Sequence, residues 1–363
     1  MHIVQVLPEL NEGGVERGTV DLNRELVRRG YSSSVLSKGG RLESQILADG
    51  GKPVSVPVAS KNPATFPVRC LRLQRQLDEI NPDIVHVRSR MPGWLAWHAN
   101  KRAKRPMVST VHGFNSVNSY SKIMIKGDRV ICVSEAVRDY VTKHYQFNQE
   151  RLRVIPRGVD LDYFDPEKMD TSFVSSFRNR FELQDSFVVT SIGRLTSLKD
   201  YETFLRAFAL LRWEIENVRG LIVGGAHMKK RRYAHELRAL ATSLALDGIV
   251  HFVGSVAEIR EIYALSDVIV SASKKPESFG RTCAEALAMG RPVVATNHGG
   301  VPEIVKHREH GFLIEIESPE SLAESVHLCR YLNRDGLRAH IAENFSLDQM
   351  ISKTLNVYGE LAQ

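Results

Sequence analysis

Short apolar runs alternate with amphipathic stretches along almost the whole chain. The first run, residues 2–7, predicts a short buried strand, and residues 15–29 have the apolar spacing of a helix that Gly30 ends. The alternation repeats down to residue 155 and starts again at residue 186. Strands that alternate with helices predict doubly wound α/β domains, in which ligands lie at the carboxyl ends of parallel strands.

The pattern places each element. We expect strands at residues 2–7, 33–37, 53–58, 83–87, 106–111, 128–133, 152–155, 186–192, 218–223, 250–252, 267–271, 293–295 and 311–314. We expect helices at residues 15–29, 41–49, 66–80, 91–101, 135–144, 201–213, 229–246, 256–265, 282–289, 319–332 and 346–361. Between the halves, Pro156, Gly158 and Pro166 with little periodicity indicate a domain boundary, which we place near residue 168. A chain of 363 residues is long enough for two domains.

Composition and charge add to this picture. With 43% hydrophobic and 25% charged residues, the chain is globular and not disordered. Its net charge of +7 is uneven: residues 1–165 carry 25 Lys and Arg against 17 Asp and Glu, a net +8, and residues 166–363 carry 24 against 25. The basic first half indicates an acidic partner there, such as an anionic membrane surface or a phosphorylated lipid.

Two further features bear on the compartment. The N-terminus lacks a charged leader region and no run of 18 apolar residues occurs, so we expect a first strand and not a signal peptide. The four cysteines are widely separated without a C-x-x-C pair, which indicates free thiols in a reducing cytoplasm. We therefore expect a cytoplasmic protein, and the inner face of the cytoplasmic membrane is its expected site if the basic face contacts lipid.

Residues 276–303 carry the densest candidate chemistry. Glu277 precedes a predicted helix that starts near Thr282, and the start of a helix presents unpaired N–H groups and about half a positive charge. Residues 279–282 are therefore a candidate phosphate-binding site, and Gly280, which has no side chain, allows the phosphate to approach the backbone closely. Glu277 and Glu285 can accept hydrogen bonds from sugar hydroxyls on either side. The arrangement indicates a sugar–phosphate–ribose ligand.

The string ESFGRTCAE at 277–285, followed by PVVAT and GGVPEIV, resembles the E-x7-E region of family-4 retaining glycosyltransferases. The alternative is an ordinary surface helix with two solvated glutamates. The resemblance covers most of residues 1–345 and implies the GT-B fold, two Rossmann-like doubly wound domains facing a cleft. It implies an acceptor-binding domain at 1–168, a nucleotide-sugar domain at 169–345, and a C-terminal helix at 346–363 that packs back on the first domain.

Two glycine-bearing motifs of the second half support the resemblance. The string GR-x4-KD, with Gly193, Arg194 and Lys199, resembles the family's diphosphate clamp. The Arg194 guanidinium can fork two phosphate oxygens, and Lys199 supplies a point charge that helps to neutralise the leaving group. A solvated basic loop is the alternative. Gly224 resembles the family's glycine turn near the nucleotide.

The first half carries weaker signals. Gly13 and Gly14 resemble the family's loop against the donor phosphate, although a simple tight turn is an equal alternative. His112, at a strand end in TVHG, resembles the residue beside the transferred sugar, and a purely structural histidine is the alternative. Arg157 stands where the family commonly has Asn, so no role is carried over to it. Trp94 and Trp97 before the basic cluster 101–105 indicate either a membrane interface or packing inside the domain.

The resemblance thus implies a set of site residues. The catalytic candidates are His112, Glu277, Arg194 and Lys199, and the donor-binding candidates are Gly13, Gly14, Gly193, Arg194, Lys199, Gly224, Glu277, Ser278, Phe279, Gly280, Arg281, Thr282 and Glu285. We expect no metal and no cofactor, because the two cations and the helix start balance the diphosphate.

We expect a metal-independent, retaining glycosyltransferase that moves a hexose or N-acetylhexosamine from a nucleotide sugar, with UDP favoured. The expected acceptor is a lipid-linked or lipopolysaccharide-type glycan, with peripheral contact to an anionic membrane and no nucleic acid as partner. Three other functions are the alternatives. A dinucleotide oxidoreductase needs G-x-G-x-x-G, which NEGGVERG at 11–18 lacks. A basic nucleic-acid-binding protein and a sugar-nucleotide epimerase on the same fold are the others.

Overall fold

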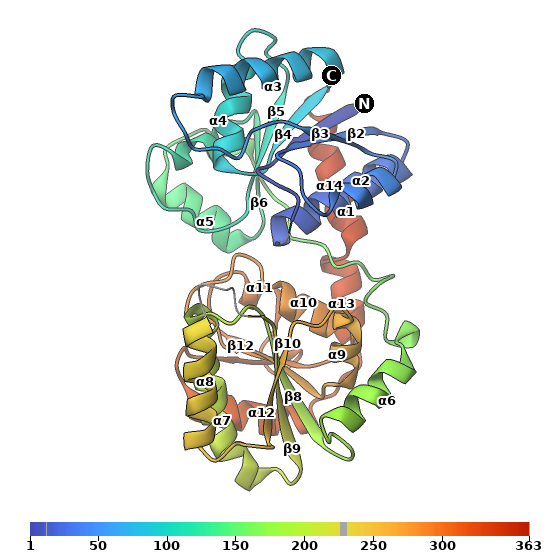
Figure 1. The fold of residues 1–363 in the computed structure, drawn as a ribbon, viewed down its shortest axis with the longest axis vertical. Coiled ribbons are helices and arrows are strands. Elements are labelled where there is room, and N and C mark those ends of the chain that lie inside the picture. Colours follow the sequence, from blue (N-terminus) through green and yellow to red (C-terminus); the bar gives the residue numbers. More distant parts are fainter. Residues whose placement is uncertain (12, 226–230, 363) are drawn as a thin grey trace. The chain divides into compact units, whose positions relative to one another are not determined.

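The computed structural model describes residues 1–11, 13–225 and 231–362, with the side chain of Arg231 left out of the description (Figure 1). The chain forms two compact units. The first comprises Met1–Gly158 together with the C-terminal segment that starts at Leu347, and the second is Val159–Ser346. Within the described part of the chain, no helix is long and apolar enough to cross a membrane.

The first unit is built on a parallel seven-stranded sheet of order β3-β2-β1-β4-β5-β6-β7. Its strands are β1 His2–Val6, β2 Ser32–Ser37, β3 Lys52–Ser55, β4 Ile84–Val87, β5 Met107–Val111, β6 Arg129–Cys132 and β7 Leu152–Val154. Its helices are α1 Gly14–Arg28, α2 Glu43–Ala48, α3 Phe66–Ile80, α4 Arg90–Ala99, α5 Glu135–His144 and α14 Leu347–Gly359. The central strands are short and almost wholly buried because helices cover both faces of the sheet.

Helix α14 completes this unit from the far end of the sequence. Figure 1 shows α14 in red beside α1. Ile351 and Tyr358 are fully buried in one apolar cluster with Ile3 of β1 and Leu26 of α1. The Tyr358 hydroxyl lies 2.6 Å from Nδ1 of the buried His86, whose Nε2 lies 2.7 Å from the Thr110 hydroxyl. The helix therefore supplies both apolar cover and a polar partner to the centre of the sheet.

The second unit is built on a parallel six-stranded sheet of order β10-β9-β8-β11-β12-β13. Its strands are β8 Phe187–Ile192, β9 Val218–Val223, β10 Val250–Gly254, β11 Val268–Ser271, β12 Val293–Thr296 and β13 Gly311–Ile314. Its helices are α6 Thr171–Arg180, α7 Tyr201–Glu214, α8 Arg231–Ser243, α9 Ile259–Leu265, α10 Arg281–Ala288, α11 Val301–Ile304, α12 Pro319–Leu328 and α13 Leu337–Asn344. In Figure 1, α7, α8 and α12 lie on one side of this sheet, and α9, α10 and α13 lie on the other.

The two doubly wound parallel α/β domains expected from the alternation are confirmed. The division between the units lies at Gly158, earlier than the expected boundary near residue 168. The reason is packing: Phe164 stacks edge-on against Tyr263, with ring centroids 5.9 Å apart, and Arg338 donates a hydrogen bond of 2.9 Å to the Leu161 carbonyl. The expected start of the helix at residue 229 lies outside the described residues.

The two tryptophans pack inside the first unit. Trp94 and Trp97 are half-buried, and the Trp94 indole donates a hydrogen bond of 2.9 Å to the Tyr120 carbonyl. The Lys101 and Lys126 ammonium groups lie 4.6 and 4.4 Å from the centroid of the Trp97 ring. Of the two interpretations of this aromatic and basic stretch, the structure favours packing within the domain with the cations at its edge.

Candidate active site

Three loops of the second unit gather at one edge of its sheet. Strands β8, β11 and β12 are neighbours in the sheet and run parallel, so the loops that follow them emerge at the same edge. These loops carry Lys199, Glu277 and the Gly299–Gly300 turn. The backbone of Glu277 pairs with Gly299 in a parallel bridge, and the Gly300 N–H donates a hydrogen bond of 2.8 Å to the Glu277 carbonyl. Sequence positions that lie far apart thus form one site.

The central contact of this site is an ion pair between two of the loops. The Lys199 ammonium lies 2.5 Å from Oε1 of Glu277, and this oxygen also accepts hydrogen bonds from the Ser273 hydroxyl at 2.7 Å and from Ser271 at 3.4 Å. Burial of Glu277 by itself would raise its pKa, but the Lys199 charge and the three donors outweigh it, and the pKa is lowered. Glu277 is therefore a carboxylate whose orientation is fixed.

Two glycines allow the loops to approach this closely. Gly299 has φ +64°, and a Cβ there would lie 2.3 Å from the Glu277 carbonyl oxygen. A Cβ at Gly224, which follows β9, would lie 1.9 Å from the carbonyl oxygen of Gly193. Any larger residue at either position would push the backbones apart. The predicted glycine turn at Gly224 therefore packs directly on the start of the loop that carries Arg194 and Lys199.

Helix α10 starts at the same edge. Gly280 caps it in the left-handed region at φ +107°, and no side chain of the described residues caps its first turn. Further along the helix, one oxygen of Glu285 accepts a hydrogen bond of 2.8 Å from the Tyr263 hydroxyl. Burial, followed by the charge of Glu285, raises the pKa of Tyr263, so this hydroxyl remains a donor. The helix thus presents backbone N–H groups at its start and an oriented carboxylate about one turn further on.

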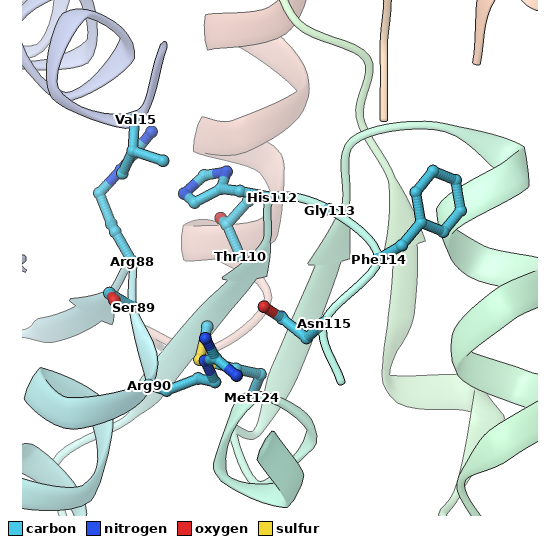
Figure 2. A pocket seen from close by; sticks show the side chains of 10 residues that line it. All are labelled: Val15, Arg88, Ser89, Arg90, Thr110, His112, Gly113, Phe114, Asn115 and Met124. Atoms are coloured by element: carbon cyan, nitrogen blue, oxygen red, sulfur yellow. The ribbon is translucent and has the colours of Figure 1, made fainter. Parts of the chain in front are cut away.

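In the first unit, His112 lies at the end of β5 beside a pocket of about 320 Å³ (Figure 2). Nδ1 of His112 accepts a hydrogen bond of 2.8 Å from the Arg157 guanidinium, which has no acceptor atom of its own. The proton of the neutral ring therefore sits on Nε2, which is buried and has no hydrogen-bond partner among the described residues. Burial first, and then the charges of Arg157 and Arg88, lower the pKa of His112 well below its ordinary value.

Comparison with known proteins identifies the family. Residues 12–163 match the family model described as Glycosyltransferase Family 4, and residues 175–345 match the model described as Glycosyl transferases group 1. A crystal structure of a glycosyltransferase from Rickettsia africae is 30% identical, with a TM-score of 0.92, and the alignment covers 100% of this chain and 98% of that one. The chain belongs to glycosyltransferase family 4.

More distant relatives agree with this assignment. The D-inositol 3-phosphate glycosyltransferase of Actinosynnema mirum is 26% identical to this glycosyltransferase over 96% of this chain and 92% of its own length. The structure of Anabaena HepE in complex with UDP and glucose is 22% identical with a TM-score of 0.85, and the alignment covers 98% of each chain. At that identity the likeness speaks for the fold, and together these matches confirm the expected GT-B fold.

The structure brings some of the predicted residues together in this glycosyltransferase. Lys199, Glu277 and the start of α10 at Gly280–Thr282 lie at one sheet edge, with Ser278 between them and Gly193 and Gly224 packed beside them. Arg194 is exposed, and within the described residues its side chain makes no ion pair or hydrogen bond. The side chain of Phe279 is buried 5.9 Å from the Phe345 ring, so only its backbone is placed to meet a ligand.

The predicted residues of the first unit form their own groups. Gly13 caps helix α1 with φ +143°, and a Cβ at Gly14 would contact nothing within 4 Å. His112 is hydrogen-bonded to Arg157, for which no role was predicted. Sequence reasoning also missed Ser271 and Ser273, the donors to Glu277. Their alternation at the end of β11 is the signal that could have found them, because residues i and i+2 point to the same side of a strand.

Replacing Lys199 with Met tests the ion pair. The folded pKa of Glu277 is lowered, so its contribution to stability is present above the unfolded value, about 4.3, and is lost as the pH falls through the folded value. Without Lys199, burial raises that pKa, and the buried charge costs about 2 kcal/mol at neutral pH. We expect the stability deficit, measured by denaturant unfolding, to shrink from pH 7 to pH 4.

The control is Lys275→Met, which removes an exposed lysine from the loop that carries Glu277. It should leave the pH profile of stability unchanged. The double variant Lys199→Met with Glu277→Gln should recover most of the loss at pH 7, because it removes the uncompensated charge as well. A deficit of Lys199→Met that stays constant over the whole pH range would contradict the pairing.

The protonation state of His112 gives a second test. Nitrogen NMR of 15N-histidine protein should show a neutral ring with the proton on Nε2 near pH 6.5, where an ordinary histidine is half protonated. His112→Asn assigns the signal. In Arg157→Gln the fixed charge next to Nδ1 is gone, so the ring should titrate closer to the ordinary pKa. A wild-type His112 signal that is half protonated at pH 6.5 would show that the ring is not held in this form.

Proposed function

We propose that this family-4 glycosyltransferase moves a hexose or N-acetylhexosamine from a UDP sugar to a lipid-linked or lipopolysaccharide-type glycan, with retention of anomeric configuration. The observation that carries the proposal is the Lys199–Glu277 pair beside the uncapped start of α10. This arrangement offers positive charge for a diphosphate and a fixed carboxylate for sugar hydroxyls within one loop cluster.

The diphosphate is assigned to the cationic part of this edge. Arg194 is exposed beside the site, and its fork can hold two phosphate oxygens, while the N–H groups of Arg281 and Thr282 supply further donors. Lys199 already holds Glu277 and would share its three donors between the carboxylate and a phosphate. Glu285, steadied by Tyr263, is assigned to the ribose hydroxyls, and Glu277 to the sugar hydroxyls.

A pocket in the second unit supports the proposal that a nucleoside binds at the donor site. It has a volume of about 380 Å³ and is lined by Leu195, Ile222, Gly224, Gly225, Ala234, His235, Arg238, Phe252 and Gly254. Arg238 lies over the Phe252 ring at 5.1 Å, which gives a flat surface of the kind that stacks on a base. The Anabaena neighbour of known structure binds UDP and UDP-glucose, and this favours UDP as the carrier here.

We also propose that the reaction proceeds with retention and without a metal ion. Arg194, Lys199 and the start of α10 can balance the leaving diphosphate without a divalent ion. We propose that a leaving phosphate oxygen takes the proton of the acceptor hydroxyl on the face from which the diphosphate departs. The Nε2–H of His112 is a hydrogen-bond donor, so His112 is assigned to positioning a substrate oxygen and not to removing the proton.

The acceptor is inferred from the first unit and from relatives. The excess of basic residues in 1–165 favours an anionic acceptor or membrane surface. Curated relatives are named D-inositol 3-phosphate glycosyltransferases, and structural neighbours include WaaG, described as a glycosyltransferase of lipopolysaccharide biosynthesis. The four free cysteines suit a reducing cytoplasm, where we propose that the enzyme acts.

A panel of nucleotide sugars tests the donor. UDP, GDP and ADP sugars are compared by thermal shift on the wild type and on Glu285→Ala, each relative to its own ligand-free protein. A UDP sugar at 100 times its Kd should stabilise the wild type by about 2.7 kcal/mol. Loss of a charged hydrogen-bond partner should weaken binding to Glu285→Ala by tenfold or more.

Two matched variants complete the panel. Glu324→Ala removes an exposed carboxylate from α12 and should leave the shift unchanged. Tyr263→Phe removes the hydroxyl that orients Glu285 but keeps the carboxylate, so its shift should fall between those of wild type and Glu285→Ala. If no nucleotide sugar stabilises the wild type, the proposed activity is wrong.

Product analysis tests the course of the reaction. Once a donor and acceptor pair is found, the reaction is run in EDTA and the product is examined by proton NMR. We expect turnover without added metal and the same anomeric configuration in donor and product. An inverted product would contradict retention, and activity that appears only after a divalent ion is restored would contradict metal independence.

A further inference from the structure

We infer that the pocket beside His112 in the first unit binds a phosphate monoester carried by the acceptor, with Arg88 and Arg90 as its cationic ligands. That the ligand is the acceptor rests on the proposed function. That it carries a phosphate rests on the pocket itself. The pocket lies at the carboxyl ends of β4 and β5, where an α/β domain of this type binds its ligands.

Arg88 carries the argument, because it is a buried cation without an acid. Its exposed fraction is 5%, and among the described residues its side chain donates one hydrogen bond, of 3.0 Å, to the neutral amide oxygen of Gln5. Its Nε is buried without a partner, and no carboxylate among the described residues forms an ion pair with it. Burial lowers the pKa of Arg88 to about 10, and the weaker attractions of Asp21 and Glu16 do not offset it. A buried charge in this state is costly unless something pairs with it.

The pocket that Arg88 lines also holds a second cation and neutral donors. Arg90 is half-buried, donates a hydrogen bond of 3.2 Å to the Ser121 hydroxyl, and lies over the Tyr120 ring at 5.3 Å. At this pocket, the Nε2–H of His112 is a further buried donor that has no hydrogen-bond partner among the described residues. Figure 2 shows Arg88, His112, Asn115 and Arg90 around the pocket, with the amide of Asn115 directed into it.

A phosphate monoester fits this set of donors. It presents three acceptor oxygens and close to two negative charges at neutral pH, which match two guanidinium groups and an N–H donor. A neutral sugar would leave Arg88 uncompensated. A volume of about 320 Å³ holds the phosphate together with the sugar or polyol ring that bears it.

Binding to small phosphates tests the site. Inorganic phosphate, and the pair glucose 6-phosphate and glucose, are titrated by calorimetry into the wild type, Arg90→Gln and Arg88→Gln. We expect both phosphates to bind, glucose to bind at least tenfold more weakly than glucose 6-phosphate, and Arg90→Gln to lose at least tenfold in affinity for both phosphates. Arg90→Gln is the decisive variant, because Arg90 is half-buried and its loss leaves the core of the unit intact. The control, Arg72→Gln, removes an exposed arginine of α3 and should bind as the wild type does.

Variants of the second unit separate this inference from the proposed function. Phosphate could instead occupy the donor site, so Lys199→Met is titrated alongside. If phosphate affinity is lost in Lys199→Met but kept in Arg90→Gln, the pocket does not bind phosphate, and the proposed function stands. If glucose binds as tightly as glucose 6-phosphate, the pocket inference is wrong as well. If no nucleotide sugar stabilises the protein while Arg90→Gln alone loses phosphate, the proposed activity fails and the anion pocket remains.

Discussion

The candidate donor site depends on one constraint: a mostly buried carboxylate must be paired. Glu277 meets it through Lys199 and two serines, and this contact has structural requirements of its own. It requires β8 and β11 to be neighbours, so that the loops after them meet. It also requires a glycine at 299, because any Cβ there would collide with the Glu277 carbonyl. The contacts of one atom, Oε1 of Glu277, thus depend on the strand order, the turn geometry and the charge of Lys199.

Most of the fold could be predicted from the sequence, because buried parallel strands and amphipathic helices leave different periodicities. Glu277 and Lys199 could also be predicted as site residues, since each lies in a short recognisable motif. Their contact with each other could not be predicted, because no single segment of the sequence determines the order of the strands in the sheet. The boundary was misplaced for a similar reason: Phe164 lies in an irregular stretch, and only its contact with Tyr263 assigns it to the second unit.

Arg157 shows how a departure from a family pattern can be accommodated locally. A Cβ on Gly18 would lie 2.4 Å from a guanidinium nitrogen of Arg157, so the glycine in helix α1 leaves room for the Arg157 side chain in this position. Arg157 then fixes the proton of His112 on Nε2. An asparagine could have offered either a donor or an acceptor to that ring, whereas arginine offers only donors. The substitution therefore makes His112 a donor toward the pocket.

The two units treat buried charge in opposite ways. In the second unit, Lys199 and Glu277 neutralise each other, and Lys274 is likewise held between Asp200 at 3.3 Å and Glu317 at 2.7 Å. Such a site is complete before any ligand arrives, and a ligand has only to add to it. In the first unit, Arg88 is buried with a neutral amide as its partner, so the free energy cost of burying its charge is not offset by a carboxylate. Binding an anion there would relieve that cost, so part of the affinity would come from destabilisation already present in the free protein. Such a pocket discriminates against neutral acceptors, because a neutral acceptor would leave the buried Arg88 charge without a counter-charge.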